Sequence, residues 1–207
     1  MVKVKICGIT NLEDARVSAD AGCDALGFVF YKKSPRYISP KRAGDIIKSL
    51  PPHIIKIGIF VNAQEQTIKR IAKKCSLNML QFHGSESPEF CERFRGYKII
   101  KAFRINGAID IKTVSRYQTF AYLFDTFSKS KVGGTGKRFN WKLIRHIRNI
   151  KRPVFLSGGL NVKNVKEAIK SVRPDWVDVS SSVEIKLGKK DHKKVKKFID
   201  TVKKTAL

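Results

Sequence analysis

The amino-acid sequence predicts an α/β protein, folded as a single-domain (β/α)8 TIM barrel over residues 1–207. Strand-like and helix-like segments alternate from one end of the chain to the other, and eight segments have strand character. No low-complexity linker marks a domain boundary, and a barrel of ~250 residues or fewer commonly forms one domain. A doubly wound open sheet is the alternative, but it more often has five or six strands, and no G-x-G-x-x-G motif follows the first strand here.

The predicted strands are short runs rich in Val, Ile and Phe. Runs that are apolar almost throughout, such as residues 26–30, are typical of parallel strands that are buried on both faces. The eight predicted strands are residues 2–7, 25–30, 55–61, 79–83, 99–103, 121–125, 154–157 and 176–180.

Helix start signals stand between these strands. Thr10 and Asn62 each precede a Glu by three residues, which is the spacing of a capping box. Ser39 and Ser87 each precede a proline, which suits a first helical turn. Apolar residues then recur at helical spacing within residues 68–72, 143–147 and 165–172. A last helix is expected from Asp191, with one apolar face made of Val195, Phe198, Ile199 and Val202.

The charge balance is strongly basic. Lys and Arg number 43 against 17 Asp and Glu, a formal net charge of +26. Such a surplus favours anionic partners, although dispersed lysines are first of all a solvated surface. A dedicated nucleic-acid binder would gather its basic residues around exposed aromatic side chains, whereas most aromatic residues here fall in strands or on helix faces.

The sequence also bears on location and metal binding. The N-terminal segment lacks the long apolar stretch of a signal peptide, and no apolar run approaches the ~18 residues that span a bilayer. Four cysteines without a C-x-x-C pair indicate reduced thiols rather than a metal knuckle. We therefore expect a cytoplasmic protein with no metal site and no membrane association.

Candidate reactive groups stand where the predicted strands end. In a parallel barrel these ends meet at one rim, where such enzymes keep their active sites. Cys7 ends the first strand and is followed by Gly8, which lets backbone or ligand approach closely. Cysteines in apolar strands are commonly small buried hydrophobic residues. Nearby Lys5 and Arg36, however, are expected to lower the pKa of the thiol towards neutrality, so that Cys7 would serve as a base or nucleophile.

Asp125 is the second candidate for chemistry. It follows the apolar run of residues 121–124 and ends the sixth predicted strand. A structural role, in which the carboxylate caps the next loop, is one interpretation. The other is a partly desolvated carboxyl group that donates a proton as a general acid.

Small residues follow the last two strands. Gly158 and Gly159 precede a helix expected near Asn161, and Ser180, Ser181 and Ser182 are placed to open a short extra helix. Backbone N–H groups at such places suit a phosphate dianion, and barrel enzymes frequently bind phosphate there. Two ordinary small-residue turns are the alternative. Glycines also recur in the loop after Asp125, where Gly133 and Gly134 suggest a phosphate cradle, a lid or a merely flexible loop.

Two further side chains complete the rim. Arg36 follows Pro35, and its planar guanidinium suits a substrate carboxylate, although most single arginines lie on the surface. His83 ends the fourth strand, where a hydrogen-bonded structural role is more common than a catalytic one.

The ordered set of these motifs resembles the phosphoribosylanthranilate isomerase family of tryptophan biosynthesis. The resemblance rests on residues 5–10, 27–30, 34–36, 58–62, 81–84, 133–136, 157–160 and 178–181, with Phe139 and Trp141, in that order along almost the whole chain. It implies a (β/α)8 barrel that rearranges N-(5-phosphoribosyl)anthranilate to 1-(2-carboxyphenylamino)-1-deoxyribulose 5-phosphate without a cofactor or metal.

The resemblance also implies roles for individual residues. Asp125 would protonate the furanose ring oxygen, and Cys7 would remove the C2 proton from the resulting Schiff base. Arg36 would meet the anthranilate carboxylate, with His83 and Gly133–Gly134 as further substrate contacts. Gly158, Gly159 and Ser180–Ser182 would hold the phosphate. The protein is expected to be a monomer or homodimer.

Two alternatives and two departures accompany the resemblance. Another phosphosugar isomerase barrel, such as the aminoaldose isomerase of histidine biosynthesis, performs the same rearrangement, but that family resembles a duplicated half-barrel with a carboxylate where Cys7 stands. A basic nucleic-acid-binding protein is the alternative from a different class. Where the family usually has Gly, Ser182 would be strained if the position needs a positive φ and would otherwise be free to contact phosphate. Asn140 replaces a common Asp, and either residue can cap a helix.

Overall fold

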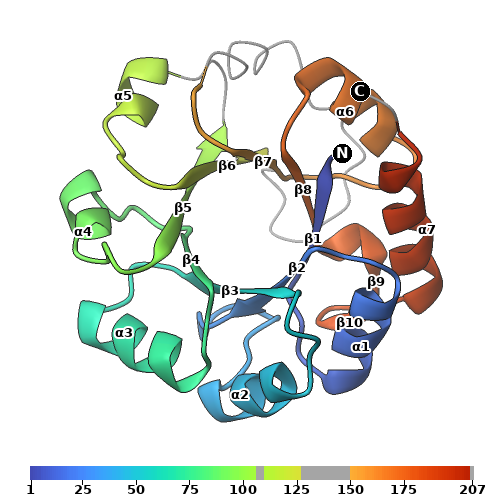
Figure 1. Cartoon of the computed structure of the whole chain (residues 1–207), viewed down its shortest axis with the longest axis horizontal. Helices are drawn as coiled ribbons and strands as arrows, with labels where there is room; N and C mark the ends of the chain where they lie inside the picture. Colours follow the sequence, from blue (N-terminus) through green and yellow to red (C-terminus); the bar gives the residue numbers. More distant parts are fainter. Residues whose placement is uncertain (106–109, 127–149, 206–207) are drawn as a thin grey trace.

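The computed structural model describes residues 1–105, 110–126 and 150–205, and it is a closed barrel of eight parallel strands (Figure 1). Each strand pairs with its neighbours in the sequence, and β1 closes the barrel against β8. The strands are β1 (Lys3–Cys7), β2 (Ala25–Val29), β3 (Ile55–Phe60), β4 (Met79–Phe82), β5 (Lys98–Ile105), β6 (Ala121–Thr126), β7 (Val154–Leu156) and β8 (Trp176–Val179). The predicted fold class is confirmed, and β5 is longer than the sequence indicates.

Helices surround the barrel as an outer ring (Figure 1). They are α1 (Leu12–Asp20), α2 (Pro40–Lys48), α3 (Glu65–Lys74), α4 (Pro88–Glu92), α5 (Ile111–Ser115), α6 (Val165–Val172) and α7 (His192–Lys203). After β8 come the short 3₁₀ turn η2 (Ser181–Val183) and a hairpin of β9 (Glu184–Lys186) and β10 (Lys189–Lys190). The helix predicted around residues 143–147 lies outside the described residues.

The predicted helix starts are partly confirmed. Ser39 and Ser87 cap α2 and α4 through their side chains, and Asp191 caps α7. The predicted capping box at Thr10 is wrong, because Asn11 is the cap residue and its side chain accepts the bond from Asp14 N.

The predictions at Asn62 and near Asn161 are also wrong. Asn62 adopts a left-handed backbone with φ 48°, and its side chain bonds Ser85 instead of α3, which begins after Gln64. Helix α6 begins only at Val165, because Asn161 uses its side-chain oxygen to close a turn on Lys163 and Asn164. The side chains of Asn residues compete for backbone donors in this way and favour turns.

Two apolar clusters form the core. The larger cluster lies between barrel and helices, and the smaller fills the barrel from one end with residues such as Ile57, Leu123, Phe155 and Trp176. Side chains alternate between the two faces of a strand. Two residues further along the strands, the side chains on this inner face form a polar layer inside the barrel, which includes Lys5, Gln81 and Asp178. All three are buried.

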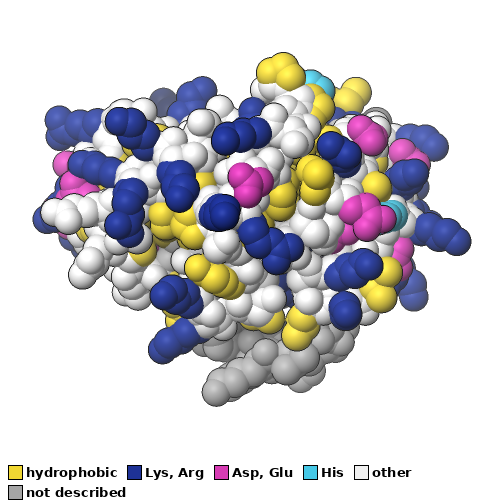
Figure 2. All heavy atoms as spheres, turned by 90° about the horizontal axis from the view of Figure 1, so that it is seen from below, with side chains coloured by type: hydrophobic (Ala, Val, Ile, Leu, Met, Phe, Trp, Pro, Cys, Tyr) yellow, Lys and Arg dark blue, Asp and Glu magenta, His cyan; other side chains and the backbone are white. Residues whose placement is uncertain are grey.

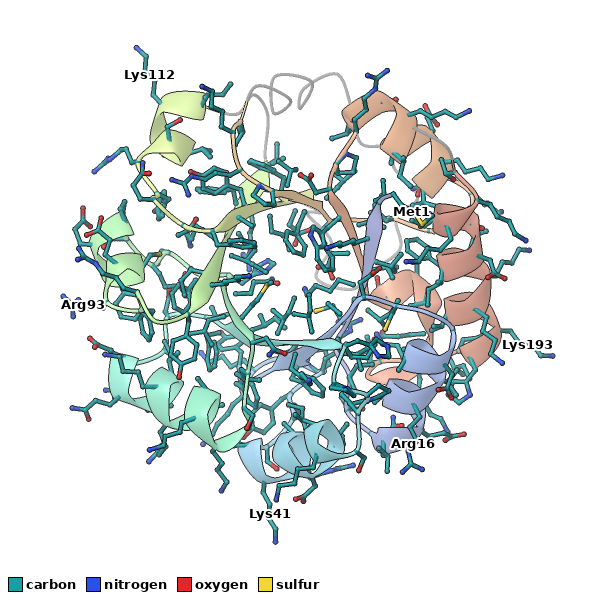
Figure 3. The ribbon with its side chains drawn as sticks, in the orientation of Figure 1. Met1, Arg16, Lys41, Arg93, Lys112 and Lys193 are labelled. Carbon is teal, nitrogen blue, oxygen red and sulfur yellow. The ribbon has the colours of Figure 1, made fainter. Side chains whose placement is uncertain are left out.

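Many basic side chains lie on the outside of the barrel. Arg16, Lys41, Arg93, Lys112 and Lys193 project outward from the helix ring (Figure 3). On the face seen in Figure 2, Lys and Arg side chains are spread over the surface and interrupted by acidic and apolar ones. Among the described residues, no helix combines the length and apolar character needed to cross a membrane.

Candidate active site

The sulfur of Cys7 lies at the end of β1, above the buried polar layer of the barrel. Lys5, two residues earlier, points to the same side of the strand and is fully buried. Its Nζ lies 3.0 Å from Asp178 Oδ1 on β8 and donates to Gln81 Oε1 at 2.8 Å. The pairing of β1 with β8 sets Lys5 directly beside Asp178. A buried ammonium group therefore meets a carboxylate from the neighbouring strand, as burial of charge requires.

The pKa of the Cys7 thiol is raised, which corrects the expectation that Lys5 and Arg36 would lower it towards neutrality. Burial is the largest cause, and Asp178 adds to it; Lys5, Lys190 and Arg36 lower the pKa without overcoming these effects. For Lys5, burial alone lowers the pKa, but Asp178 and the Cys7 thiolate together raise it above its ordinary value. Lys5 is therefore a cation, and it stabilises the thiolate form of Cys7 once that form is reached.

Arg36 is held in a buried ion-pair network on the same side of the mouth. Its Nε and Nη2 each donate to Glu184 at 2.7 Å, which is the bidentate geometry of a strong arginine–carboxylate pair. Lys190 Nζ donates to Glu184 Oε1 at 2.9 Å and to the carbonyl oxygen of Cys7 at 2.6 Å. Hydrogen bonding to Glu184 is the main cause that raises the pKa of Arg36. Glu184 leaves Nη1 of Arg36 for a ligand.

Gly8 lets Arg36 approach the end of β1. Gly8 has φ 80°, and a Cβ atom there would stand 2.5 Å from Arg36 Cδ. Any larger residue would push the guanidinium stem away from Cys7 and also suffer the strain of a positive φ. The close approach predicted for Gly8 is therefore made by Arg36.

Asp125 stands at the end of β6, across the mouth from Cys7. Its side chain is 29% exposed, and Oδ2 lies 3.3 Å from His83 Nε2. The other ring nitrogen of His83, Nδ1, lies 2.8 Å from Gln81 Nε2. The structure thus brings Asp125 and His83 together, and it links both to Lys5 through Gln81. The loop that Asp125 would cap in the structural interpretation follows residue 126 and lies outside the described residues.

The two predicted phosphate loops lie side by side after β7 and β8. Gly158 and Gly159 have φ of 86° and 65°. Both residues are therefore in the left-handed region, which glycine adopts without strain. Ser180 Oγ donates to the carbonyl oxygen of Cys7 at 3.1 Å. Ser181 begins the short turn η2, as the sequence predicted for an extra helix. Gly133, Gly134 and Asn140 lie outside the described residues.

The conformation of Ser182 answers the question raised by a serine where the resembled family usually has glycine. It is absent from the described residues with positive φ, so the strain considered for this position does not arise. Its hydroxyl donates to the carbonyl oxygen of Leu160 in the loop after β7. Ser182 therefore joins the loops after β7 and β8, and its hydroxyl proton is already used in this bond.

Sequence reasoning missed four charged or polar side chains of this site: Gln81, Asp178, Glu184 and Lys190. All four are buried. A sequence signal existed for one of them: a lysine within the apolar strand of residues 2–7 needs a carboxylate partner, and Asp178 stands opposite Lys5 on β8. Asp178 Oδ1 lies 3.0 Å from Lys5 Nζ, so its charge is met by the buried ammonium group. Within the described residues, no group of three or more His, Cys, Asp or Glu is arranged to hold a metal ion.

These features define a class. The chain is a (β/α)8-barrel protein whose polar groups gather at the carboxyl ends of the strands, with cationic side chains and small-residue loops suited to an anionic small molecule. A carboxyl group and a thiol stand on different sides of that mouth. The fold and the site are those of a barrel enzyme.

Comparison with known proteins gives the family. Residues 4–201 match the family model for N-(5'-phosphoribosyl)anthranilate (PRA) isomerase. The isomerase of Thermotoga neapolitana is 50% identical over 204 residues, covering 98% of this chain and 99% of that protein. The isomerase of Citrifermentans bemidjiense is 47% identical over 207 residues, covering both chains completely.

Solved structures agree. The crystal structure of phosphoribosyl anthranilate isomerase from Thermotoga maritima has a TM-score of 0.93 and 48% identity, covering 98% of this chain and 99% of that one. A structure in complex with reduced 1-(o-carboxyphenylamino)-1-deoxyribulose 5-phosphate has a TM-score of 0.89 and 46% identity, with the same coverage. The chain belongs to the N-(5'-phosphoribosyl)anthranilate isomerase family. It is an isomerase of tryptophan biosynthesis that converts an aldose to a ketose.

Proposed function

We propose that Asp125 and Cys7 are the general acid and general base of this isomerisation. The observation that carries the proposal is their placement: each ends a barrel strand, β6 and β1, at the rim where barrel enzymes bind substrate. An acid and a base on different sides of the mouth can act on different atoms of one substrate.

The reaction begins with Asp125 in its protonated form. Asp125 gives its proton to the furanose ring oxygen, the C1–O bond breaks, and the nitrogen lone pair forms the C1=N bond of a Schiff base. The Cys7 thiolate then removes the proton from C2, the electrons of that C–H bond form the C1=C2 bond of an enolamine, and the π electrons of the C1=N bond return to nitrogen. Transfer of a proton from the C2 hydroxyl to C1 gives the ketone. Atoms balance throughout, so the product is an isomer of the substrate.

The network around Cys7 supports the second step. The raised pKa of the thiol makes its thiolate a stronger base but a scarcer one at neutral pH, and a general base works best when its pKa lies near the operating pH. Lys5, Lys190 and Arg36 all favour the thiolate electrostatically, so the charge that develops on sulfur is met by fixed cations.

Arg36 and the loops after β7 and β8 bind the two anionic groups of the substrate. Arg36 Nη1, which Glu184 leaves unused, meets the anthranilate carboxylate. Backbone N–H groups around Gly158–Gly159 and Ser180–Ser181 hold the phosphate. His83 acts through Asp125. In the related structure the ligand carries the same carboxylate and phosphate groups, which supports this assignment.

Two experiments test the proposal. In the first, phosphoribosylanthranilate is generated in the cuvette, and its fluorescence is expected to fall when the purified protein is added. The variants Cys7→Ser and Asp125→Asn are expected to lose most of the rate of this fall. Inorganic phosphate or sulfate competes with substrate and, in a crystal, occupies the space between Gly158–Gly159 and Ser180–Ser181. An anion bound elsewhere on the barrel, with this space empty, would contradict the phosphate assignment.

Assembly and location remain predictions. A solved relative from Thermotoga maritima is described as a dimer from which monomers were generated, and we propose that this chain is a homodimer or a monomer in the cytoplasm. Analytical ultracentrifugation at micromolar concentration distinguishes the two states.

A further inference from the structure

A line of polar contacts crosses the barrel mouth from the base side to the acid side. Lys5 Nζ donates to Gln81 Oε1 at 2.8 Å, Gln81 Nε2 lies 2.8 Å from His83 Nδ1, and His83 Nε2 lies 3.3 Å from Asp125 Oδ2. Lys5 and Gln81 are buried, at 0% and 1% exposure, so water does not compete for these contacts. The line therefore has one fixed arrangement at its inner end.

The chemistry of Lys5 sets the direction of every donor along the line. An ammonium group has donors and no acceptor, so the atom of Gln81 beside Lys5 must be the amide oxygen. The pKa of Lys5 is raised despite burial, because Asp178 and Cys7 favour its charged form. The amide nitrogen of Gln81 must then point to His83, and because it too is only a donor, Nδ1 of His83 must accept.

The tautomer of His83 follows. A neutral imidazole carries one hydrogen, so a ring whose Nδ1 accepts carries it on Nε2. That N–H is the ring atom nearest to Asp125 Oδ2. The backbone of His83 is held as well, since its N–H donates to the carbonyl oxygen of Phe60 at 2.9 Å.

The tautomer decides whether the proton of Asp125 is available. If Nε2 were an acceptor, protonated Asp125 would give its hydrogen bond to His83 and the acid proton would point away from the substrate. With Nε2–H facing Oδ2, the proton of Asp125 must sit on Oδ1. The carboxylate left after proton transfer also finds a donor already in place.

We propose that Gln81 is a positioning residue that, anchored by Lys5, fixes His83 in the Nε2–H tautomer and so keeps the proton of Asp125 on Oδ1, free for transfer to the substrate. This inference rests on the proposed role of Asp125 as the general acid. In this proposal Lys5, which lies beside Cys7, also fixes the hydrogen-bond donors and acceptors that lead to Asp125.

Long-range ¹H–¹⁵N spectra of the ¹⁵N-labelled full-length protein report the tautomer directly. The chain has four histidines, and the His83 resonances are those lost in His83→Gln. The expected result is a single Nε2–H form of neutral His83. A neutral ring with its hydrogen on Nδ1, or an equal mixture, would overturn the proposal.

Gln81→Glu supplies the decisive variant. A carboxylate keeps the contact with Lys5 but can only accept, so Nδ1 of His83 must now carry a hydrogen. We expect this change in the spectrum together with a fall in kcat of roughly 10- to 100-fold, a part of the ~10²–10⁴ that a general acid contributes, while KM changes little. The matched control is Gln66→Glu, the same substitution at an exposed position of α3. The spectral change without any loss of kcat would contradict the proposal.

Gln81→Met guards against a folding defect in the first variant. It removes the donor to His83 and introduces no charge, and we expect both tautomers of His83 with a smaller loss of kcat. A single Nε2–H form in Gln81→Met would show that Gln81 does not set the tautomer. Asp125→Asn separates the two claims: unchanged turnover in that variant would remove Asp125 as the acid, while the spectra of the Gln81 variants would still report the tautomer.

Discussion

The two sides of the barrel mouth differ in how their reactive groups are surrounded. On the β1 side, Cys7 is set among Lys5, Asp178 and Lys190, which are nearly or wholly buried. On the β6 side, Asp125 is 29% exposed, and its Oδ2 lies 3.3 Å from Nε2 of His83. Fixed charges therefore surround the proposed base, whereas the proposed acid depends on the orientation of one imidazole and on the substrate that covers it.

This difference teaches where each group obtains its reactivity. Charges buried in the folded protein act on Cys7 whether or not substrate is bound, because the low dielectric and the lack of water preserve their effect. A partly exposed carboxyl group is reached by water and is tuned only when ligand displaces that water. Variants of the buried charged residues on the β1 side are thus expected to disturb folding and chemistry together, and variants on the β6 side mainly chemistry.

The largest effect is expected for Cys7→Ser. An alcohol is a far weaker acid than a thiol, so the serine is not ionised near neutral pH and cannot take the C2 proton. We expect a fall in kcat of roughly 10²–10⁴, the contribution of a general base, with a folded protein by circular dichroism. Turnover close to that of the original enzyme, with the chemical step rate-limiting, would remove Cys7 from this role.

Glu184→Gln tests the buried charges on the β1 side. It leaves Lys190 and Arg36 without their carboxylate partner, and removing one member of a buried pair costs about 3–5 kcal/mol. We expect that loss in the free energy of unfolding measured with urea, and a raised KM because Arg36 is no longer fixed.

The control for this variant is Glu65→Gln, which removes an exposed ion pair with Lys69. Its free energy of unfolding is expected to stay nearly unchanged, since water and salt screen such pairs. Equal losses in the two variants would show that burial of the Glu184 network adds nothing to stability.

The pH dependence of kcat/KM sharpens the comparison further. A base must lose its proton to act, and burial raises the pKa of the Cys7 thiol above its ordinary value of 9.0. Ionisation of the proposed base therefore contributes a limb to the profile that rises with pH through the neutral range. A rate that is already constant at neutral pH would mean that the surrounding cations outweigh burial.

The fold and the rim could be predicted from the sequence because both follow from local patterns. Apolar runs of strand length identify the eight strands, and their order places Cys7, Asp125 and Ser180 at one rim. The ionisation of Cys7 could not be predicted, since Asp178 and Lys190 are more than 170 residues away in the sequence. The sign of the pKa shift depends on burial and on these distant charges together, and no local pattern contains their sum.

The cap residues show the same limit on a smaller scale. Spacing favoured Thr10 and Asn62 as caps, but the loops they belong to use them otherwise. Thr10 Oγ1 donates to the carbonyl oxygen of Gly188 in the β9–β10 turn at 2.5 Å, and Asn62 accepts from Ser85 near the end of β4. Tertiary contacts decided both cases, whereas Ser39 and Ser87, followed by proline, kept their local roles.

The smallest effect is expected for Ser182→Gly. The variant removes the hydrogen bond to Leu160 that joins the two phosphate loops, and it adds backbone freedom. We expect stability to fall by about 0.5–1.5 kcal/mol, the usual net value of one hydrogen bond. Phosphate would then inhibit less strongly. A more stable variant would indicate strain at Ser182 that the backbone does not show.

Single-turnover kinetics of Asp125→Asn test most directly the claim that Asp125 supplies the acid, separately from the base at Cys7. Asparagine keeps the shape of the side chain and its acceptor but has no acidic proton to give to the ring oxygen. The account predicts a chemical step slowed by roughly 10²–10⁴ with little change in substrate affinity. An unchanged rate of ring opening would contradict it, and His83 would then be the next group to examine as the acid.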